Sequence, residues 1–201
     1  MKSVFHAFMG FRLFAAVILT AAIFSFSMAL HAAWIPLKAE LAQWLIERSW
    51  EEVQRGGPGH PWPWADTRPA AVLAVPQQGI RLLVLEGNSG RNLAFGPVMD
   101  SGVLSGRDLV ISGHRDTHFG FLRTLSAGDR VLLTRPEGDQ WYEVNSLEVV
   151  DSRAQAMVIE PGIDRLSLVT CYPFDSALAG GPLRYVVTAL PLKPRRSLSS
   201  G

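Results

Sequence analysis

Cysteine is nearly absent from this chain of 201 residues, since Cys171 is the only one. A single cysteine excludes an internal disulfide, and it excludes zinc sites that are built from several thiolates. The chain also lacks an excess of charge, because 19 Lys and Arg stand against 18 Asp and Glu. Nucleic-acid-binding proteins need a dense basic surface, so this class of protein is excluded as well.

Charged residues are missing altogether between Leu13 and Leu37. About 20 apolar residues in a helix cross the hydrocarbon core of a bilayer, so residues 13–36 are predicted to be a transmembrane anchor. Lys2 and Arg12 precede this segment and no acid does. Positive charge is retained on the cytoplasmic side, which predicts that residues 1–12 are cytoplasmic and that the rest of the chain lies outside the cytoplasm.

A cleaved signal peptide is the competing interpretation of this segment. The small residues Ala29, Ala32 and Ala33 suit a cleavage site. However, the charge-free run is longer than the apolar core of about 7–15 residues that is usual in signal peptides. The length therefore favours an anchor that is retained.

Residues 37–69 are predicted to be an amphipathic helix followed by a linker. The apolar residues of the helix recur at helical spacing. They are Leu37, Leu41, Trp44, Leu45 and Val53. The linker is rich in Gly and Pro, which break regular structure. Trp62 and Trp64 add aromatic surface to it, which suits either a membrane interface or cover for an edge of the next domain.

Short apolar runs separated by turn residues follow from Ala71 onward, a pattern that is typical of β-strands. The predicted strands are Ala71–Val75, Ile80–Leu85, Asp108–Ser112, Arg130–Thr134, Trp141–Val150, Arg165–Thr170 and Leu183–Leu190. Many strands with little helix predict an all-β domain over residues 70–191, folded as a barrel or a sandwich. Only Phe121–Ser126 and Met157–Glu160 suggest short helical or loop inserts. Residues 192–201 carry no apolar pattern and are predicted to be disordered.

Three residues with useful chemistry stand at strand ends. Cys171 follows an apolar strand and precedes Pro173, which suits a thiol that faces a groove, although a lone cysteine is most often a buried apolar residue. His114 closes another strand after Gly113, where a surface turn histidine is the alternative. Arg184 opens the last strand, either as an exposed strand residue or as a fixed donor to an oxyanion.

Taken together, these residues give the chain a resemblance to the sortase family of membrane-anchored cysteine transpeptidases. The matching pieces are SGHRD with His114, LSLVTC with Cys171 and LRYVV with Arg184, in the order and spacing of that family. The resemblance extends from about Pro61 to Leu190. The stretches PWPWADTRPA, LEGNSGRNLAFGP and TCYPFDSALAGGPLRY look like the Gram-negative single-sortase branch and its class D relatives.

The resemblance implies a sortase-type eight-stranded β-barrel with short helices and a groove at the strand ends. It implies that Cys171 attacks the Thr carbonyl of an LPxTG-like sorting signal and forms a thioester. His114 would act as general acid and base, and Arg184 would donate to the oxyanion or to the peptide backbone. The implied partners are a substrate protein with this C-terminal signal and an amine acceptor. No cofactor or metal is implied, and the location would be periplasmic in a Gram-negative cell.

The motif HRDTH leaves a different chemistry open. In an extended segment His114, Asp116 and His118 share one face, and with Cys171 they predict a metal site for a metal-dependent hydrolase. The milder interpretation places these side chains in a turn or in the groove wall. In that case Asp116 and His118, together with Tyr172, are candidate substrate-binding residues.

Two further functions remain as alternatives. A hydrolytic cysteine peptidase would use the same barrel, because water and an amine compete for one thioester. A non-enzymatic, membrane-tethered module would only bind a partner in the cell envelope. Thr170 receives no chemical role, because the period of two along a strand turns its side chain away from that of Cys171.

Overall fold

The computed structural model describes residues 2–87, 89–100, 107–154, 160, 162–176 and 180–192, with side chains from residue 16 onward. The chain divides into two compact units, Met1–Gln43 and Trp44–Gly201. The first unit is helical, and the second contains the end of the same helix and all the strands.

A single helix, α1 (Lys2–Gln54), runs through the first unit and into the second without a break at Pro36. From Ala16 to Gln54 it is, by length and composition, long and apolar enough to cross a membrane. Between Ala16 and Glu40 its apolar side chains are exposed, as at Phe24 and Ile35. The division into an anchor over residues 13–36 and an amphipathic helix after it stays a prediction.

The last turns of α1 bury a different apolar stripe from the one predicted. Ile46, Trp50 and Val53 are buried, at the spacing of one helix face. Ile46 packs with residues of β2 (Ile80–Glu86) and β3 (Val98–Met99), and Trp50 and Val53 pack with β1 (Pro69–Val75). Of the predicted stripe, Val53 is buried, whereas Trp44 is 56% exposed. The end of this helix carries two apolar stripes, and the one that contains Ile46 and Trp50 is buried against the strands.

The linker after α1 packs on the strand domain. Trp62 meets Phe95 edge to face, with 5.4 Å between the ring centroids. The Thr67 hydroxyl donates to the carbonyl of Glu86 at 2.7 Å. Trp62 therefore covers part of the strand domain, whereas Trp64 is exposed.

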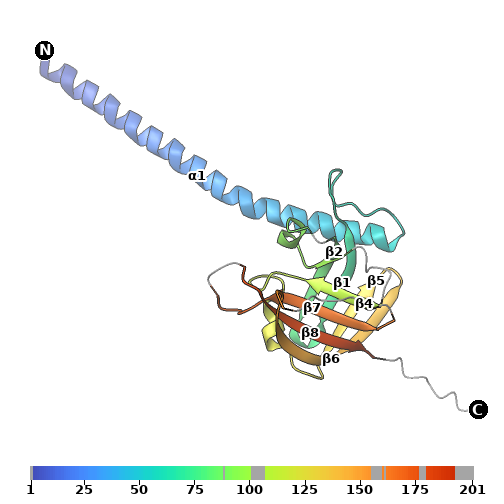
Figure 1. Cartoon of the computed structure of the whole chain (residues 1–201). Coiled ribbons are helices and arrows are strands. Elements are labelled where there is room, and N and C mark those ends of the chain that lie inside the picture. Colours follow the sequence, from blue (N-terminus) through green and yellow to red (C-terminus); the bar gives the residue numbers. More distant parts are fainter. Residues whose placement is uncertain are drawn as a thin grey trace, which may run out of the picture. The chain divides into compact units, whose positions relative to one another are not determined.

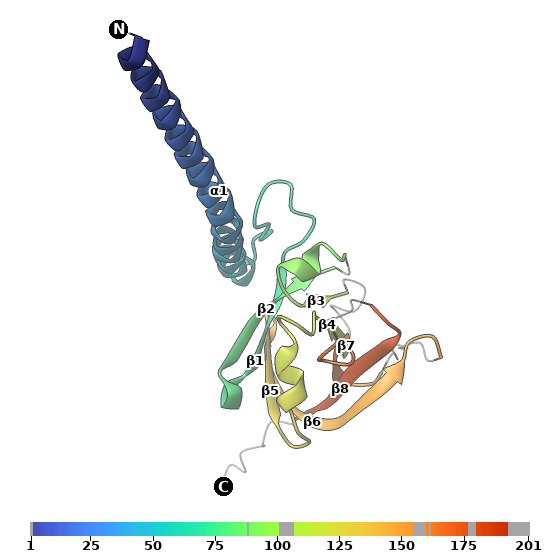
Figure 2. The same ribbon diagram turned by 90° about the vertical axis from the view of Figure 1, so that its left-hand side faces the viewer.

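Eight strands form a closed barrel, as the sequence predicts (Figures 1 and 2). Five follow β1, β2 and β3 along the chain. They are β4 (Asp108–Ser112), β5 (Arg130–Arg135), β6 (Gly138–Asp151), β7 (Arg165–Cys171) and β8 (Leu183–Pro191). Around the barrel the order is β1-β2-β3-β4-β7-β8-β6-β5. All seven predicted strands are found at or slightly beyond their predicted bounds, and β3 is the strand that the sequence pattern missed.

Among the described residues, three short 3-10 helices connect the strands. They are η1 (Pro76–Gln78), η2 (Asn92–Ala94) and η4 (Gly120–Thr124). The last overlaps the predicted insert Phe121–Ser126, and Leu122 of η4 is fully buried in the core with Phe119 just before it. The other predicted insert, Met157–Glu160, lies outside the described residues except for Glu160.

The inward side chains of the strands build one apolar core. Its largest members are fully buried, and burial of one such side chain is worth about 1.5–3 kcal/mol. They include Leu73, Leu109, Ile111, Phe119, Leu133, Leu166 and Leu168. Because these residues alternate along their strands, every second position is left facing outward, and the outward positions at the strand ends are available for chemistry.

One parallel strand pair, β4 with β7, aligns two distant parts of the chain. Its register runs from Asp108 beside Arg165 to Ser112 beside Val169. At its start the Asp108 carboxylate is buried and accepts from Arg165 Nε at 2.7 Å and Nη2 at 2.9 Å, and from the backbone N–H of Glu160 at 2.8 Å. Burial alone would raise the pKa of Asp108, but these donors outweigh it and hold the pKa below its ordinary value.

We predict that the two halves of this ion pair differ in importance. Arg165→Met leaves Asp108, whose side chain is 2% exposed, without a countercharge and should destabilise the fold by about 3 kcal/mol. Asp108→Asn leaves Arg165, which is 24% exposed and can reach water, and should cost about 1–2 kcal/mol. Urea unfolding of the full chain in detergent measures both values. Equal costs would show that the burial of the carboxylate does not matter.

We also predict that the contribution of Asp108 depends on pH. Because its pKa is lower in the folded chain, ionised Asp108 stabilises the fold above its ordinary pKa, and this stabilisation disappears as the pH falls through the folded value. The stability difference between the original chain and Asp108→Asn should therefore be constant near neutral pH and shrink below about pH 4. A difference that grows on acidification would contradict this assignment.

Candidate active site

The parallel ladder brings His114 and Cys171 to the same end of the barrel. The two residues lie two positions beyond Ser112 and Val169, the last pair of the register. The ladder continues one step further, since the N–H of Gly113 donates to the carbonyl of Val169 at 3.1 Å. Adjacent strands lie about 4.8 Å apart, so the imidazole and the thiol start from neighbouring backbone positions on one face.

Thr170 fastens these two strand ends to each other. It is buried, and its hydroxyl donates to the carbonyl of Gly113 at 2.7 Å. Its side chain therefore points inward, as predicted, while that of Cys171 is partly exposed. Thr170 has a structural task at the site: it ties the residue before Cys171 to the residue before His114.

Arg184 lies on the other side of Cys171. The antiparallel register of β7 and β8 pairs Cys171 with Arg184, and side chains of such a pair share one face with about 5 Å between their Cβ atoms. Arg184 Nη1 donates to the carbonyls of Gly181 at 2.7 Å and Leu183 at 2.9 Å. Its other N–H groups donate to none of the described residues, so the structure leaves donors available beside the thiol.

The segment after His114 is a turn, and this contradicts the extended segment on which the metal hypothesis rested. The N–H of Phe119 donates to the carbonyl of His114 at 2.9 Å and closes the turn. Among the residues that the structure describes, no three His, Cys, Asp or Glu side chains gather where they could hold a metal ion. The metal-dependent hydrolase that was predicted from HRDTH is therefore not supported by the geometry.

The two further candidates in this turn differ in their surroundings. Asp116 is exposed and lies 3.3 Å from Arg115 Nε. His118 is half-buried, with Nδ1 3.3 Å from the Thr117 hydroxyl. The pKa of His118 is below its ordinary value, first because burial disfavours the charged form and second because the charge of His114 repels it.

Tyr172, the third candidate, belongs to an aromatic cluster beside Cys171. Its ring stacks on Tyr185 at 6.1 Å and meets Phe174 edge to face at 6.1 Å. Phe174 and Tyr185 also contact each other at 5.1 Å and pack against the core. The cluster therefore packs the loop after Cys171 against β8 and the core. A substrate-binding role for Tyr172, Asp116 or His118 stays a prediction.

Arg115 is a residue of the site that the sequence analysis missed. It follows His114 directly and is 4% exposed. Its Nη1 donates to the carbonyl of Pro173 at 2.9 Å, and Nη2 donates to the carbonyl of Ser176 at 2.7 Å. The only signal in the sequence is a charge placed next to the histidine in HRD, and such a charge is usually solvated.

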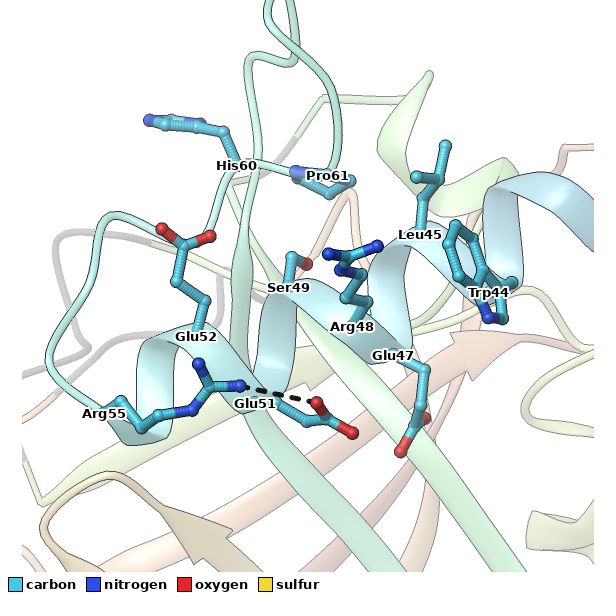
Figure 3. A pocket seen from close by; sticks show the side chains of 10 residues that line it. All are labelled: Trp44, Leu45, Glu47, Arg48, Ser49, Glu51, Glu52, Arg55, His60 and Pro61. Atoms are coloured by element: carbon cyan, nitrogen blue, oxygen red, sulfur yellow. Dashed lines mark hydrogen bonds and ion pairs between the residues drawn. The ribbon is translucent and has the colours of Figure 1, made fainter.

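A large hollow lies elsewhere in the second unit, along the end of α1 (Figure 3). It encloses about 760 Å³ and is lined on one side by Trp44 to Arg55 and on the other by His60 and Pro61. Its charges are mixed, with an exposed ion pair of 3.4 Å between Arg55 and Glu51. Neither His114 nor Cys171 lines it, and the strand ends that carry these two residues and Arg184 are therefore a separate candidate site.

Comparison with known proteins identifies a family. The family model described as Sortase domain matches residues 73–192. Sortase D of Bacillus subtilis (strain 168) is 30% identical over 122 residues, which are 59% of this chain and 61% of the relative. The match therefore spans less than two thirds of that relative's length.

Solved structures show the same fold. Sortase A from Corynebacterium diphtheriae superposes with a TM-score of 0.54 at 24% identity, over 66% of this chain and 65% of that one. Sortase C-1 from Actinomyces oris superposes with a TM-score of 0.51 at 26% identity, over 63% of this chain and 76% of that one. Both similarities agree with the closed eight-stranded barrel.

We predict that Gly113→Ala disturbs the strand end that carries His114. A Cβ atom at Gly113 would lie 2.7 Å from Cγ of Phe119, which is fully buried and has little room to move. The expected loss of stability is about 1–3 kcal/mol, the usual cost of overpacking a core. Thermal unfolding measures it. Gly90→Ala is the matched control, since nothing lies within 4 Å of the added atom. Equal stability of the two variants would show that the contact with Phe119 is not tight.

Proposed function

Because this chain belongs to the sortase family of cysteine transpeptidases, we propose that it is a membrane-anchored sortase. It cleaves an LPxTG-like sorting signal through a thioester at Cys171 and transfers the substrate protein to an amine. The observation that carries the proposal is the alignment of three strand ends. The parallel register, which ends two residues before His114 and Cys171, brings their strand ends together, and the antiparallel register pairs Cys171 with Arg184.

The first half of the reaction forms the acyl-enzyme. The sulfur of Cys171, whose proton has passed to His114, attacks the carbonyl carbon of the signal's Thr, and the carbonyl oxygen becomes an oxyanion. When the oxyanion collapses, the C–N bond to the Gly breaks, and His114 gives a proton to the leaving amine. The product is a thioester on Cys171, which divides one difficult amide exchange into two easier steps.

The second half repeats these steps with a new amine. The acceptor amine attacks the thioester carbon while His114 takes its proton, and the C–S bond then breaks to release Cys171. Water in place of the amine gives hydrolysis through the same intermediate. Because Cys171 is partly exposed, both nucleophiles would reach the thioester.

Arg184 is assigned to the oxyanion. Its guanidinium presents several N–H donors in one plane. One nitrogen is held by the carbonyls of Gly181 and Leu183, which fixes the direction of the group. Preorganised donors of this kind stabilise developing negative charge without reorganising during the reaction.

The anchor determines where the reaction takes place. Residues 13–36 would span the cytoplasmic membrane with the N-terminus inside, and the barrel would lie outside the cytoplasm, in the periplasm if the cell is Gram-negative. Lys2 and Arg12 on the N-terminal side support this orientation. The substrate protein would meet the enzyme at that membrane surface.

We predict an acyl adduct on Cys171 when the full chain in detergent is mixed with LPxTG-type peptides. Intact-mass spectrometry should show the mass of the fragment ending at Thr on the protein and the Gly fragment in solution. The adduct should be lost in Cys171→Ala. His114→Ala and Arg184→Ala should each slow its formation by at least about 10²-fold, the typical cost of removing a general acid or an oxyanion donor.

Matched controls separate these effects from general loss of function. His60→Ala and Arg130→Ala remove an exposed histidine and an exposed arginine that lie outside the site, and both should leave the rate unchanged. Adduct formation that survives in His114→Ala and Arg184→Ala at the original rate would refute the assigned roles. The absence of an adduct with every peptide, despite a reactive Cys171, would refute the substrate class.

A further inference from the structure

We propose that Arg115 is a positioning residue of the active site. It ties the Cys loop, defined as Tyr172–Ser176, to the turn that begins at His114, and it thereby sets the thiol and the imidazole relative to each other. The inference rests on the proposed function, since it concerns the same pair of reacting groups. Arg115 does not touch the substrate in this proposal, because its side chain is 5% exposed.

The contacts of Arg115 join two segments that are far apart in the chain. Its Nη1 and Nη2 donate to the carbonyls of Pro173 and Ser176, at 2.9 Å and 2.7 Å. Both acceptors are backbone atoms of the Cys loop. The guanidinium therefore fixes the path of the loop itself rather than the orientation of one side chain, and its planar fork holds both points at once.

The charge of Arg115 supports a task of this kind. Removing a guanidinium from water is costly unless its donors find partners. The carboxylate beside it, on Asp116, is 68% exposed and lies 3.3 Å away, so this ion pair adds little. The bonds to the loop carbonyls, which a charged donor strengthens, are the contacts that define where the side chain sits.

Arg123 of η4 adds a second, weaker tie to the same loop. Its Nη1 lies 3.3 Å from Asp175, and its guanidinium lies 5.2 Å from the ring centroid of Phe174. Both partners of this ion pair are exposed, at 48% and 91%, so water competes for it. Two arginines thus bind the Cys loop, and the buried one, Arg115, fixes the position of the loop.

The contacts of Arg115 affect the reacting atoms through the backbone on both sides. Cys171 is the last residue of β7, and the Cys loop leaves the barrel immediately after it. A shift of Pro173 therefore changes the backbone conformation at Cys171. His114 directly precedes Arg115 in the chain, so a shift of Arg115 also moves His114. A misplacement of about 1 Å between reacting groups lowers a rate by about 10²-fold.

The test compares Arg115→Lys with Arg165→Lys in the full chain in detergent. Both changes keep the positive charge and remove a two-pronged contact, but Arg165 binds Asp108 at the opposite end of the β4·β7 ladder. Both variants should lose thermal stability. With an LPxTG-type peptide, only Arg115→Lys should lower kcat, by about 10²-fold and with KM little changed, because positioning acts on the chemical step.

Alkylation of Cys171 gives a readout that needs no peptide. Cys171 is the single cysteine, so iodoacetamide reports on this thiol alone. We expect Arg115→Lys and His114→Ala each to slow alkylation several-fold at neutral pH, and the double variant to be no slower than His114→Ala. Such non-additivity is the signature of one residue that acts through another. If Arg115→Lys does not fold, Arg115→Gln is measured in the same way.

The outcomes separate this inference from the proposed function. Arg115→Lys that turns over and alkylates at the original rates, while losing as much stability as Arg165→Lys, overturns the positioning role and leaves the sortase assignment in place. Slower, non-additive alkylation in a chain that cleaves no peptide refutes the substrate class but supports the positioning role. Additive effects of Arg115→Lys and His114→Ala also overturn the inference.

Discussion

The parallel pairing of β4 with β7 is the constraint on which the whole site depends. His114 and Cys171 are 57 positions apart, and so are all five pairs of this ladder, from Asp108 with Arg165 onward. A slip by one residue would set His114 beside a neighbour of Cys171 and turn the two side chains to opposite faces. In the proposed mechanism the register therefore aligns the reacting groups, and β7, with β4 on one side and β8 on the other, receives one proposed catalytic partner from each.

The two ends of this ladder are fastened by different chemistry. At the start, Asp108 and Arg165 form a buried ion pair, which specifies the register because a shifted strand would leave the carboxylate without its partner. At the catalytic end the bonds are neutral, from Gly113 to Val169 and from Thr170 to Gly113. The buried charge at this end, on Arg115, binds the loop after Cys171 rather than joining the two strands.

Much of the fold could be predicted from the sequence, because strand-forming runs and turn residues are local signals. The seven long strands and the residues at their ends follow from such patterns. β3 has only two residues, Val98 and Met99, and gives no periodic signal. The buried stripe of α1 and the turn after His114 depend on contacts with distant residues, and Phe119 at the end of that turn is a core residue that the local sequence does not reveal. Arg115 was missed for the same reason, since its acceptors are about 60 positions away.

The alternation of a strand gives each reactive residue a neighbour that faces inward. Thr170 is buried beside Cys171, Gly113 packs on Phe119 beside His114, and Tyr185 packs on the core beside Arg184. The outward residues are half-exposed or exposed and contribute little to the core, so they are free to be chosen for chemistry. Their inward neighbours are packed and hold the strand ends in position. The positions of the three proposed catalytic residues therefore depend on their inward-facing sequence neighbours, which would not contact the substrate.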